Sequence, residues 1–415
     1  MAAALSARSA WPGVALLCAT ATAAYLCRVN VSVVGALLMQ EFGLSQAQMG
    51  RVFSAFLLGY ALFMVPGGVA ADRWGTRRVL ELASWWWVVA TALQLLVGRG
   101  PLGAASTSAL WALLALRFVL GVGEAPTFPA AARGVSRWIA PERQGRANGF
   151  VIAAIAVGSA IAPPLLSAVM LRWGWRAALA VSAVPALATA VAWRLAREPA
   201  AAPMVRPEAR QRPDAPGSLR SPAFVLLTLS YSLQGYVGYV FVFWFYLYLV
   251  QERHFDFLRG GILSSLPWLL SMVSIPLGGW ISDRLVARRG PTFGRRAVPL
   301  VGLTLAGVFL SLGARTANGY VAAVSLALST ALVLSVEGPF WATMMGIAGS
   351  RSGVGGGIMN TGSNVGGLIS PALTPLLAEA IGWENALQVA AVLSVVAALL
   401  WLGISPAQSS RRVAG

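Results

Sequence analysis

Residues 117–129 read Arg117-Phe-Val-Leu-Gly-Val-Gly-Glu124-Ala-Pro-Thr-Phe-Pro129 and lie inside an apolar segment long enough to cross a bilayer. A charge near mid-membrane costs about 2.5–3.5 kcal/mol on insertion scales, so charged residues in such segments usually serve a function. Arg117 and Glu124 are two helical turns apart, which places them on one face about 10 Å apart along the axis. The pattern predicts either a buried structural ion pair or a proton-titratable acid beside an anion-binding cavity.

The composition is that of a polytopic membrane protein. Of the 415 residues, 57% are hydrophobic and only 11% are charged, whereas soluble domains carry about 25% charged residues. The net charge is +17, and every basic residue is an arginine. Because most of these arginines lie in short loops between apolar segments, where they set orientation, we expect no nucleic-acid partner. With two cysteines in one apolar segment and a single histidine, we expect no disulfide, metal or other cofactor.

Apolar segments of membrane length recur along the whole chain. The twelve predicted spans are 12–38, 49–71, 79–98, 106–130, 147–170, 175–195, 222–250, 259–281, 298–314, 319–347, 355–379 and 385–405. With the N-terminus inside, the cytoplasmic segments hold 22 arginines and the opposite side holds 7. This asymmetry predicts that both termini are cytoplasmic.

The two halves of the chain repeat. Asp72-Arg73 corresponds to Asp283-Arg284 at an offset of 211, and Glu124-Ala-Pro corresponds to Glu337-Gly-Pro at 213. Six spans separate each pair, so both halves share one orientation. We therefore predict six-helix bundles at 1–197 and 221–415, joined by a cytoplasmic linker at 198–220 that is rich in Pro, Ala and Arg. Parallel six-span repeats form the fold of the major facilitator transporters, an all-α membrane fold with the substrate site between the halves.

A charged loop motif follows the second span. The sequence Gly68-Val-Ala-Ala-Asp-Arg-Trp-Gly-Thr-Arg-Arg78 resembles the loop motif of the major facilitator transporters, and the second half carries a looser copy. The resemblance and the fixed offsets predict a charge cluster that latches helix ends in one access state, whereas topology signals alone would explain only the arginines. The predicted latch residues are Gly68, Asp72, Arg73, Gly75, Arg77, Arg78, Asp283 and Arg284.

Four charges lie within the spans and away from their ends: Arg28, Arg117, Glu124 and Glu337. Two arginines against one glutamate leave the N-terminal half positive, so an anionic substrate would balance the charge, and an arginine–carboxylate pair is the natural contact. Glu337 is followed by Gly-Pro, so it is either a second proton site or an acid that pairs locally in a kinked helix.

Four segments resemble the anion:cation symporters, which include sialin, the vesicular glutamate transporters and bacterial uptake systems for galactonate, glucarate and hexuronates. These segments are Tyr25–Asn30, Gly59–Tyr60 with Pro66–Gly68, Arg117–Glu124 and Asn360–Gly367 with Pro371. The resemblance covers nearly all of the transmembrane region. It implies a small organic anion and protons as the transported species.

The resemblance also implies roles for individual residues. Arg28 would bind the substrate carboxylate, and Tyr25 and Tyr60 would line the site. Glu124 would be the proton-coupling acid and Arg117 its charge partner. Several bacterial members of the family have an aspartate immediately before the first-span arginine, whereas this chain has Cys27, so the number of coupled protons stays open.

Residues of the second half extend the predicted site. Asn360 and Asn364 are one helical turn apart and suit hydroxyl recognition, with hydrogen bonding between helices as the alternative. Tyr236 lies in an aromatic seventh span, where packing is the more usual role, and is proposed to reach the cavity.

The sequence favours a secondary active transporter over other classes of protein. We expect proton-coupled symport of a small organic anion, such as a sugar acid, by alternating access, with a proton gradient as the driving force. An exporter or exchanger of a drug, metabolite or siderophore would share this fold. The alternatives of another class are a non-transporting receptor and a membrane-embedded enzyme, and no nucleophile–base pair supports the enzyme. We expect a monomer in the bacterial inner membrane.

Overall fold

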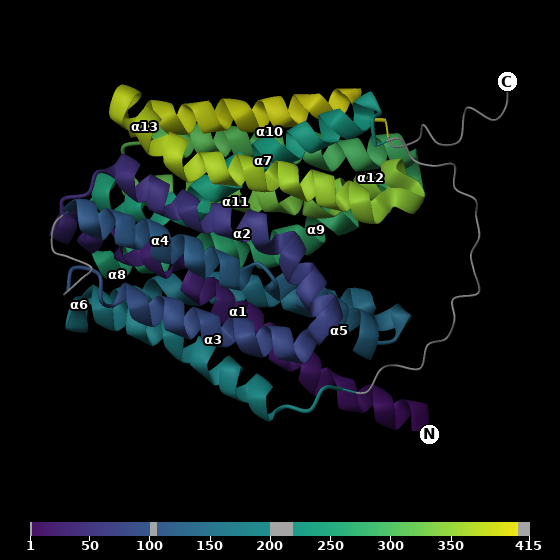
Figure 1. The fold of residues 1–415 in the computed structure, drawn as a ribbon. Helices are drawn as coiled ribbons and strands as arrows, with labels where there is room; N and C mark the ends of the chain where they lie inside the picture. The colour runs from purple at the N-terminus through teal and green to yellow at the C-terminus, as the bar shows by residue number, and fades with distance from the viewer. Residues whose placement is uncertain (1, 100–105, 200–218, 406–415) are drawn as a thin grey trace. The chain divides into compact units, whose positions relative to one another are not determined.

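The computed structural model describes residues 2–99, 106–199 and 219–405, and these described residues form helices and no strands (Figure 1). Most of the predicted linker lies outside the described residues. The α-helices are α1 Ala2–Phe42, α2 Gln46–Trp74, α3 Thr76–Gln94, α4 Ser106–Glu124, α5 Thr127–Trp138, α6 Pro141–Leu195, α7 Pro222–Leu247, α8 Phe257–Leu263, α9 Leu266–Arg289, α10 Pro291–Arg315, α11 Gly319–Ser335, α12 Glu337–Ala348 and α13 Ser352–Leu400. A π-helical turn, Tyr248–Glu252, follows α7.

The predicted spans lie on these helices, although 79–98, 222–250 and 385–405 run past the ends of α3, α7 and α13, and 106–130, 259–281 and 319–347 each cross a break between two helices. Within the described residues, nine helical stretches are long and apolar enough to cross a membrane. Two of them, Arg146–Leu195 and Val354–Gly403, hold 50 residues each and have room for two spans apiece. Each bends at a glycine with positive φ, Gly174 at 79° and Gly382 at 82°. A side chain is strained at such a φ, so glycine lets one span turn back into the next.

The chain divides into two compact units. The first comprises Met1–Ala209 and His254–Ser265, and the second comprises Arg210–Arg253 and Leu266–Gly415. The segment His254–Ser265 belongs to the first unit because it contacts α6 there: Gly261 packs against Ser167, and Ser265 donates a hydrogen bond to the carbonyl of Ala160. This grouping of a short segment from the second half was not foreseen from the sequence.

In the first unit, helices approach closely at glycines. A Cβ on Gly121 of α4 would collide with the carbonyl of Phe56 on α2, and one on Gly59 of α2 would collide with the carbonyl of Phe118. Small residues at such crossings let the helix backbones come together, and in a membrane this close packing replaces the hydrophobic effect as the source of attraction. The α2–α4 contact therefore depends on both glycines.

The second unit repeats this mode of packing. Gly366 of α13 lies against the backbone of Ser232 on α7, and Gly235 of α7 lies against Ser363 on α13. Its core also repeats a large aromatic residue, since Trp401 is fully buried as Trp193 is in the first unit. The two tryptophans are 208 residues apart, which is close to the offsets of 211 and 213 found in the sequence repeat.

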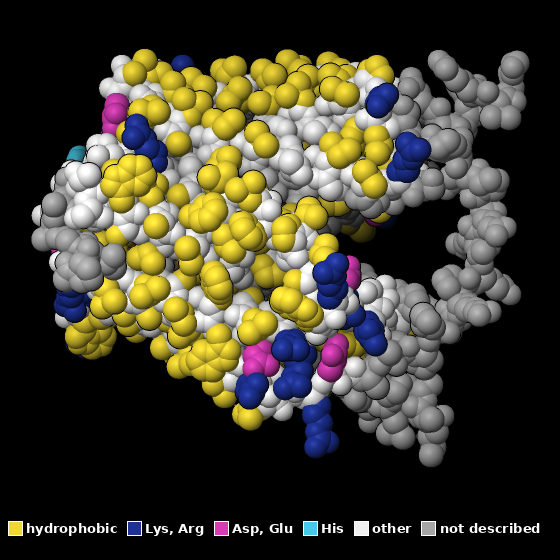
Figure 2. Space-filling model, viewed as in Figure 1, with side chains coloured by type: hydrophobic (Ala, Val, Ile, Leu, Met, Phe, Trp, Pro, Cys, Tyr) yellow, Lys and Arg dark blue, Asp and Glu magenta, His cyan; other side chains and the backbone are white. Residues whose placement is uncertain are grey.

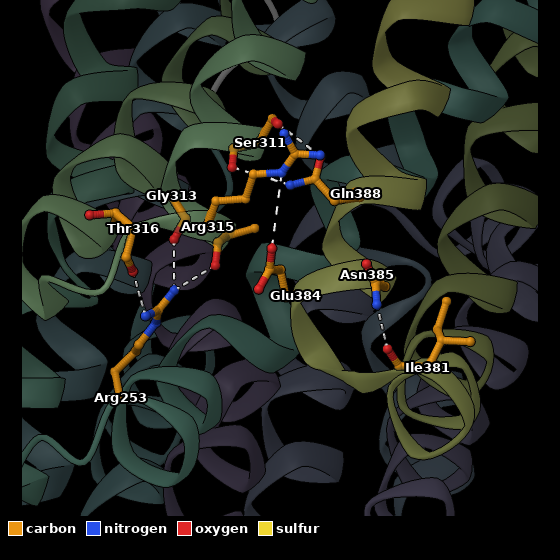
Figure 3. A network of polar contacts seen from close by, with 10 residues as sticks. Arg253, Ser311, Gly313, Arg315, Thr316, Ile381, Glu384, Asn385 and Gln388 are labelled. Carbon is orange, nitrogen blue, oxygen red and sulfur yellow. Dashed lines mark hydrogen bonds and ion pairs between the residues drawn. The ribbon is translucent and has the colours of Figure 1, made fainter.

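At one end of the second unit, Arg253 caps α10 (Figure 3). Its guanidinium donates hydrogen bonds to the carbonyls of Gly313, Ala314 and Thr316 at 2.7–2.9 Å. The last carbonyls of a helix have no partner within the helix. Arg253 satisfies them from the chain that follows α7, and thereby joins the end of α7 to the end of α10.

The outer surface of the helices suits a lipid environment. Figure 2 shows hydrophobic side chains spread over the flanks of the helices and charged side chains gathered near helix ends. Val65, Trp111 and Leu195 are 75%, 67% and 77% exposed, respectively. Exposed apolar area on this scale would be a liability in water but is what hydrocarbon covers.

Candidate functional site

Arg28 and Glu124 form an ion pair in the interior of the first unit. Arg28 lies on α1, and Glu124 is the last residue of α4. The Nε and Nη2 atoms of Arg28 lie 2.8 and 2.5 Å from Oε1 of Glu124, and the side chains are 2% and 0% exposed. Nη1 of Arg28 donates to the Tyr25 hydroxyl at 3.1 Å. The sequence-predicted Tyr25, Arg28 and Glu124 are thus brought together.

Aromatic rings surround the Arg28 guanidinium. Its carbon Cζ lies 4.4 Å from the ring centroid of Tyr25, 4.7 Å from that of Tyr60 and 5.1 Å from that of Phe56. Aromatic faces attract a cation and exclude water, so they stabilise a charge that few polar groups reach. Tyr60 was predicted from the resemblance, whereas Phe56 was missed because one phenylalanine in an apolar span carries no signal of its own.

Arg117 contacts the backbone of α1, and its implied role as charge partner of Glu124 stays a prediction. It is fully buried and donates hydrogen bonds to the carbonyls of Cys27 and Arg28 at 3.3 and 2.8 Å. The ion-pair partner of Glu124 is Arg28 and not Arg117. The reason is the spacing on α4, since two helical turns separate Arg117 from Glu124 by about 10 Å. Arg28 on α1 contacts both residues: its backbone carbonyl accepts a hydrogen bond from Arg117, and its side chain forms the ion pair with Glu124.

Prolines end α4 at the ion pair. Pro126 and Pro129 have no backbone N–H, so they cannot donate to the carbonyls of Val122 and Ala125, four residues earlier. Separately, two tryptophans of α3 bind the last turns of α4: Trp87 donates to the carbonyl of Gly123 at 3.0 Å, and Trp86 donates to that of Val119 at 2.7 Å. These bonds help to fix the end of α4 that carries Glu124.

The position before Arg28 faces the interior of the first unit. The Cys27 side chain is fully buried, and its thiol lies 3.4 Å from the carbonyl of Ser182 on α6. No carboxylate is therefore present beside Arg28 on α1.

Glu337 stands at the corresponding place in the second unit, as the first residue of α12. Its Oε2 accepts a hydrogen bond from the Tyr231 hydroxyl at 2.8 Å, and its Oε1 accepts one from Nε2 of Gln234 at 2.9 Å. Both donors lie on α7. Glu337 is therefore hydrogen-bonded locally by neutral donors, and a role as a second proton site stays a prediction. Tyr231 and Gln234 were not predicted as site residues, yet their spacing of three matches that of Tyr25 and Arg28.

The other predicted residues of the second unit lie on α7 and α13. The Tyr236 hydroxyl is 3.1 Å from Oγ1 of Thr374, and the tyrosine is only 5% exposed. Asn360 and Asn364 are partly exposed on α13. They stay candidates for substrate binding, separate from the hydrogen bonds of Glu337 with Tyr231 and Gln234.

The predicted latch residues lie at helix ends and make contacts within their own units. Asp72 pairs with Arg133 at 3.4 Å, and Asp283 pairs with Arg295 at 2.7 Å. Arg77 pairs with no aspartate among the described residues and instead donates to the carbonyls of Trp193 and Arg194 at the end of α6.

The remaining latch residues are more loosely placed. Arg73, Arg78 and Arg284 are exposed, and Gly75 forms the turn between α2 and α3 with φ at 85°. A Cβ added to Gly68 would lie 3.7 Å from the Cβ of Pro129. The motif thus contributes ion pairs, a turn and a helix cap.

The repeated bundles of membrane-length helices and the buried ion pair are typical of membrane transporters. The chain belongs to the Major Facilitator Superfamily, whose family model matches residues 16–348. It is therefore a transporter and not an enzyme, and an integral, multi-pass protein of the plasma membrane.

Several relatives match nearly the whole chain. A probable sulfoacetate transporter of Cupriavidus necator is 31% identical over 94% of this chain and 93% of its own. The hexuronate transporter of Bacillus subtilis is 27% identical over 90% of each chain, and the D-galactonate transporter of Escherichia coli is 28% identical over 92% of each. These relatives confirm the resemblance to the anion:cation symporters.

Solved structures share the fold. A bacterial homologue of the human lysosomal transporter Spinster superposes with a TM-score of 0.80 at 18% identity, covering 95% of this chain and 97% of its own. The D-xylose-proton symporter superposes with a TM-score of 0.75 at 16% identity, covering 94% and 96%. At such identities the likeness concerns the fold alone, and it confirms the predicted major facilitator architecture.

Proposed function

We propose that the chain is a proton-coupled symporter of a small organic anion, a sugar acid or a similar carboxylate, that works by alternating access. The observation that carries the proposal is the buried ion pair between Arg28 and Glu124. The names of the relatives support the substrate class, since sulfoacetate, hexuronates, glucarate and galactonate all contain a carboxylate.

Glu124 and a substrate carboxylate would compete for the same edge of Arg28. A bidentate carboxylate contact uses two N–H groups of a guanidinium. Two such nitrogens of Arg28, Nε and Nη2, already face Oε1 of Glu124. A proton on Glu124 removes the competing negative charge and frees this edge. Proton binding thus prepares Arg28 for the anion.

Charge balance gives the same coupling. The first unit buries two arginines and one glutamate at the site, Arg28, Arg117 and Glu124. This group carries a net charge of +1. A proton alone on Glu124 would raise the charge to +2 in a medium where unbalanced charge is costly, whereas a proton that enters with an anion leaves it at +1. Each ligand therefore favours binding of the other, and this reciprocity is what symport requires.

Other predicted residues keep their proposed roles. Tyr25 and Tyr60 would line the anion site, and Asn360, Asn364 and Tyr236 would bind other polar groups of the substrate. The latch residues would bias the access states.

The test uses purified protein in proteoliposomes with four carboxylates as probes: sulfoacetate, D-glucuronate, D-glucarate and D-galactonate. We expect at least one of them to be accumulated when a proton gradient is imposed, with proton entry reported by an internal pH-sensitive dye. Glu124→Gln mimics the protonated acid. It should still exchange labelled for unlabelled anion, but should lose gradient-driven accumulation.

Glu81→Gln is the matched control, because Glu81 is a carboxylate of the same unit that pairs with Arg194 at a helix end. This variant should keep both activities. Accumulation that survives in Glu124→Gln would contradict the proposed role of Glu124. Loss of exchange together with accumulation would show a structural ion pair instead.

A further inference from the structure

The two units carry matching sets of three residues at their buried acids. Tyr231 and Gln234 correspond to Tyr25 and Arg28, each 206 residues later in the chain. Glu337 corresponds to Glu124, 213 residues later. Each set joins the first helix of its unit to the point where a later helix is broken. The second set thus repeats the first with one chemical change, because glutamine takes the place of arginine.

We propose that Glu337, held by Tyr231 and Gln234, is a second proton-binding site of the transporter, which binds its proton without an arginine or an anion as a partner. The proposal rests on the proposed function and adds a site to it. It differs from the coupling at Glu124 in that no substrate group competes for the acid.

The first step is the absence of a countercharge at Glu337. Its donors Tyr231 and Gln234 are neutral, as is Trp341, which also interacts with it, and no ion pair of Glu337 occurs within the described part of the chain. A carboxylate in a membrane span without a cation is costly, and a proton is the smallest ligand that neutralises it. Glu124 avoids this cost through Arg28.

The titratable groups around Glu337 are few. From α7 these are Tyr231, which bonds it directly, and Tyr239, which lies near Tyr231. The charged residues of the other helices packed against α12 lie within about two turns of a helix end or of the bend at Gly382. They are Asp283, Arg284, Arg288 and Arg289 on α9, Arg295, Arg296 and Arg315 on α10, Glu379 and Glu384 on α13, and Arg351 on the short 3-10 helix η3 Gly349–Arg351. Of these, Arg295 is bound to Asp283, and Arg296 to the carbonyl of Ile404.

The second step is that the same contacts serve both protonation states. In the ionised state, both oxygens of Glu337 accept hydrogen bonds, as observed. When Oε2 gains a proton, it becomes a donor and needs an acceptor. The Tyr231 hydroxyl can turn and accept, because a hydroxyl both donates and accepts, while Gln234 continues to donate to Oε1. A donor-only guanidinium in place of Gln234 would favour the ionised state alone.

The third step is access. Glu337 is partly exposed, whereas Tyr231 and Gln234 are 5% and 3% exposed. Glu337 is therefore less enclosed than its two partners, and in the proposed cycle its acid exchanges a proton with water while they stay fixed in the core. The balance is simple: the carboxylate gains one proton to become the neutral acid on one side of the membrane and releases it on the other.

The consequence is a cycle with about two protons for each anion, one at Glu124 and one at Glu337. For a monoanion, such a cycle carries net positive charge, so the membrane potential as well as the pH gradient would drive it.

Infrared difference spectroscopy tests the site without a substrate. Full-length protein in detergent is titrated between acid and alkaline pH, and the carbonyl band of protonated carboxylic acids is followed. We expect one titrating band to be lost in Glu337→Gln and retained in Glu124→Gln. Gln234→Arg restores the arrangement of the first unit, and should remove the same band at neutral pH because an arginine keeps the acid ionised.

The flux measurement tests the coupling. Protons and labelled anion are counted together in proteoliposomes, using the probe carboxylate that the unmodified protein accumulates. The ratio should fall from about two to about one in both Glu337→Gln and Gln234→Arg, while anion exchange continues. Gel filtration and thermal unfolding confirm that each variant is folded.

Each outcome is decisive. A folded Glu337→Gln with an unchanged infrared spectrum would overturn the proton site. A lost band with an unchanged proton ratio would overturn its role in coupling. If the unmodified protein moves no protons with any probe, the proposed symport fails, and the infrared titration still decides separately whether Glu337 binds a proton.

Discussion

The buried acids of the two units differ in one partner. Glu124 faces the guanidinium of Arg28 at 2.5 and 2.8 Å, and Glu337 faces the amide of Gln234 at 2.9 Å. A tyrosine one turn earlier accompanies both partners, bonding Arg28 in the first unit and Glu337 in the second. The exchange of arginine for glutamine removes a charge while a hydrogen bond is kept. The same scaffold thus yields an acid coupled to a cation and an acid without one.

The comparison also separates what the repeat preserves from what it varies. The helix breaks, the glycine contacts and the arginine caps occur in both units, because helices in a membrane must satisfy their backbone groups wherever they end. Of the two buried acids, only Glu124 has an ion-pair partner among the described residues. Function can therefore diverge at one position while the fold stays the same.

The strongest test converts the first site to the kind found in the second. Arg28→Gln should lower anion transport by about 100-fold or more, because Glu124 loses its partner and the substrate loses its cation; breaking a buried pair in this way costs about 3–5 kcal/mol. Transport of the probe carboxylate in proteoliposomes measures the effect. Arg51→Gln, an exposed arginine of the same unit, is the control and should transport normally. Normal transport by Arg28→Gln would remove Arg28 from the site.

A milder change keeps the charge and alters only the geometry. Arg28→Lys should weaken binding of the probe carboxylate by about 1–3 kcal/mol, because an ammonium cannot reproduce the planar two-point contact of a guanidinium. Binding is measured by calorimetry on the purified protein. Undiminished affinity, or equal binding of the uncharged amide of the probe, would contradict a bidentate contact.

The units should respond alike where their structures agree. Arg77 donates to the carbonyls of Trp193 and Arg194, and Arg296 donates to the carbonyl of Ile404, so each caps the last long helix of its unit. Replacing either with alanine should lower the free energy of unfolding by about 1–2 kcal/mol, through the loss of charge-assisted bonds to helix-end carbonyls.

Thermal unfolding in detergent measures this loss, with the exposed Arg78→Ala as the control. A drop in Tm for Arg77→Ala but not for Arg296→Ala would show that the two caps are not equivalent.

The smallest effect on stability is expected at the loop aspartate. Asp72 is 79% exposed in its pair with Arg133, and such surface pairs contribute about 0–1 kcal/mol. Asp72→Asn should leave Tm nearly unchanged but shift the balance between inward- and outward-open states. Cysteine labelling from the two sides of the membrane reports that balance, and Glu384→Gln, in another exposed pair, is the control. Identical labelling of Asp72→Asn and the unmodified protein would leave the motif as a topology signal.

The sequence by itself determined the membrane spans, the internal repeat and the short set of charges within the spans. These features are readable because hydropathy, turn residues and rare buried charges are local properties of the chain, and a membrane tolerates few alternatives to a helix. The grouping of Tyr25, Arg28, Tyr60 and Glu124 followed from the family resemblance and agrees with the geometry of the first unit.

Only the tertiary structure decided which groups meet. Glu124 pairs with Arg28 from another helix, because Arg117 on its own helix is two turns away. Arg77, read as part of a charge cluster, is a helix cap because the end of α6 lies beside it. Tyr231 and Gln234 are recognised as site residues only through their hydrogen bonds to Glu337, which is more than 100 residues later in the chain. Such pairings depend on where helices cross, and the residue pattern within one helix does not predict which residues of another helix it will meet.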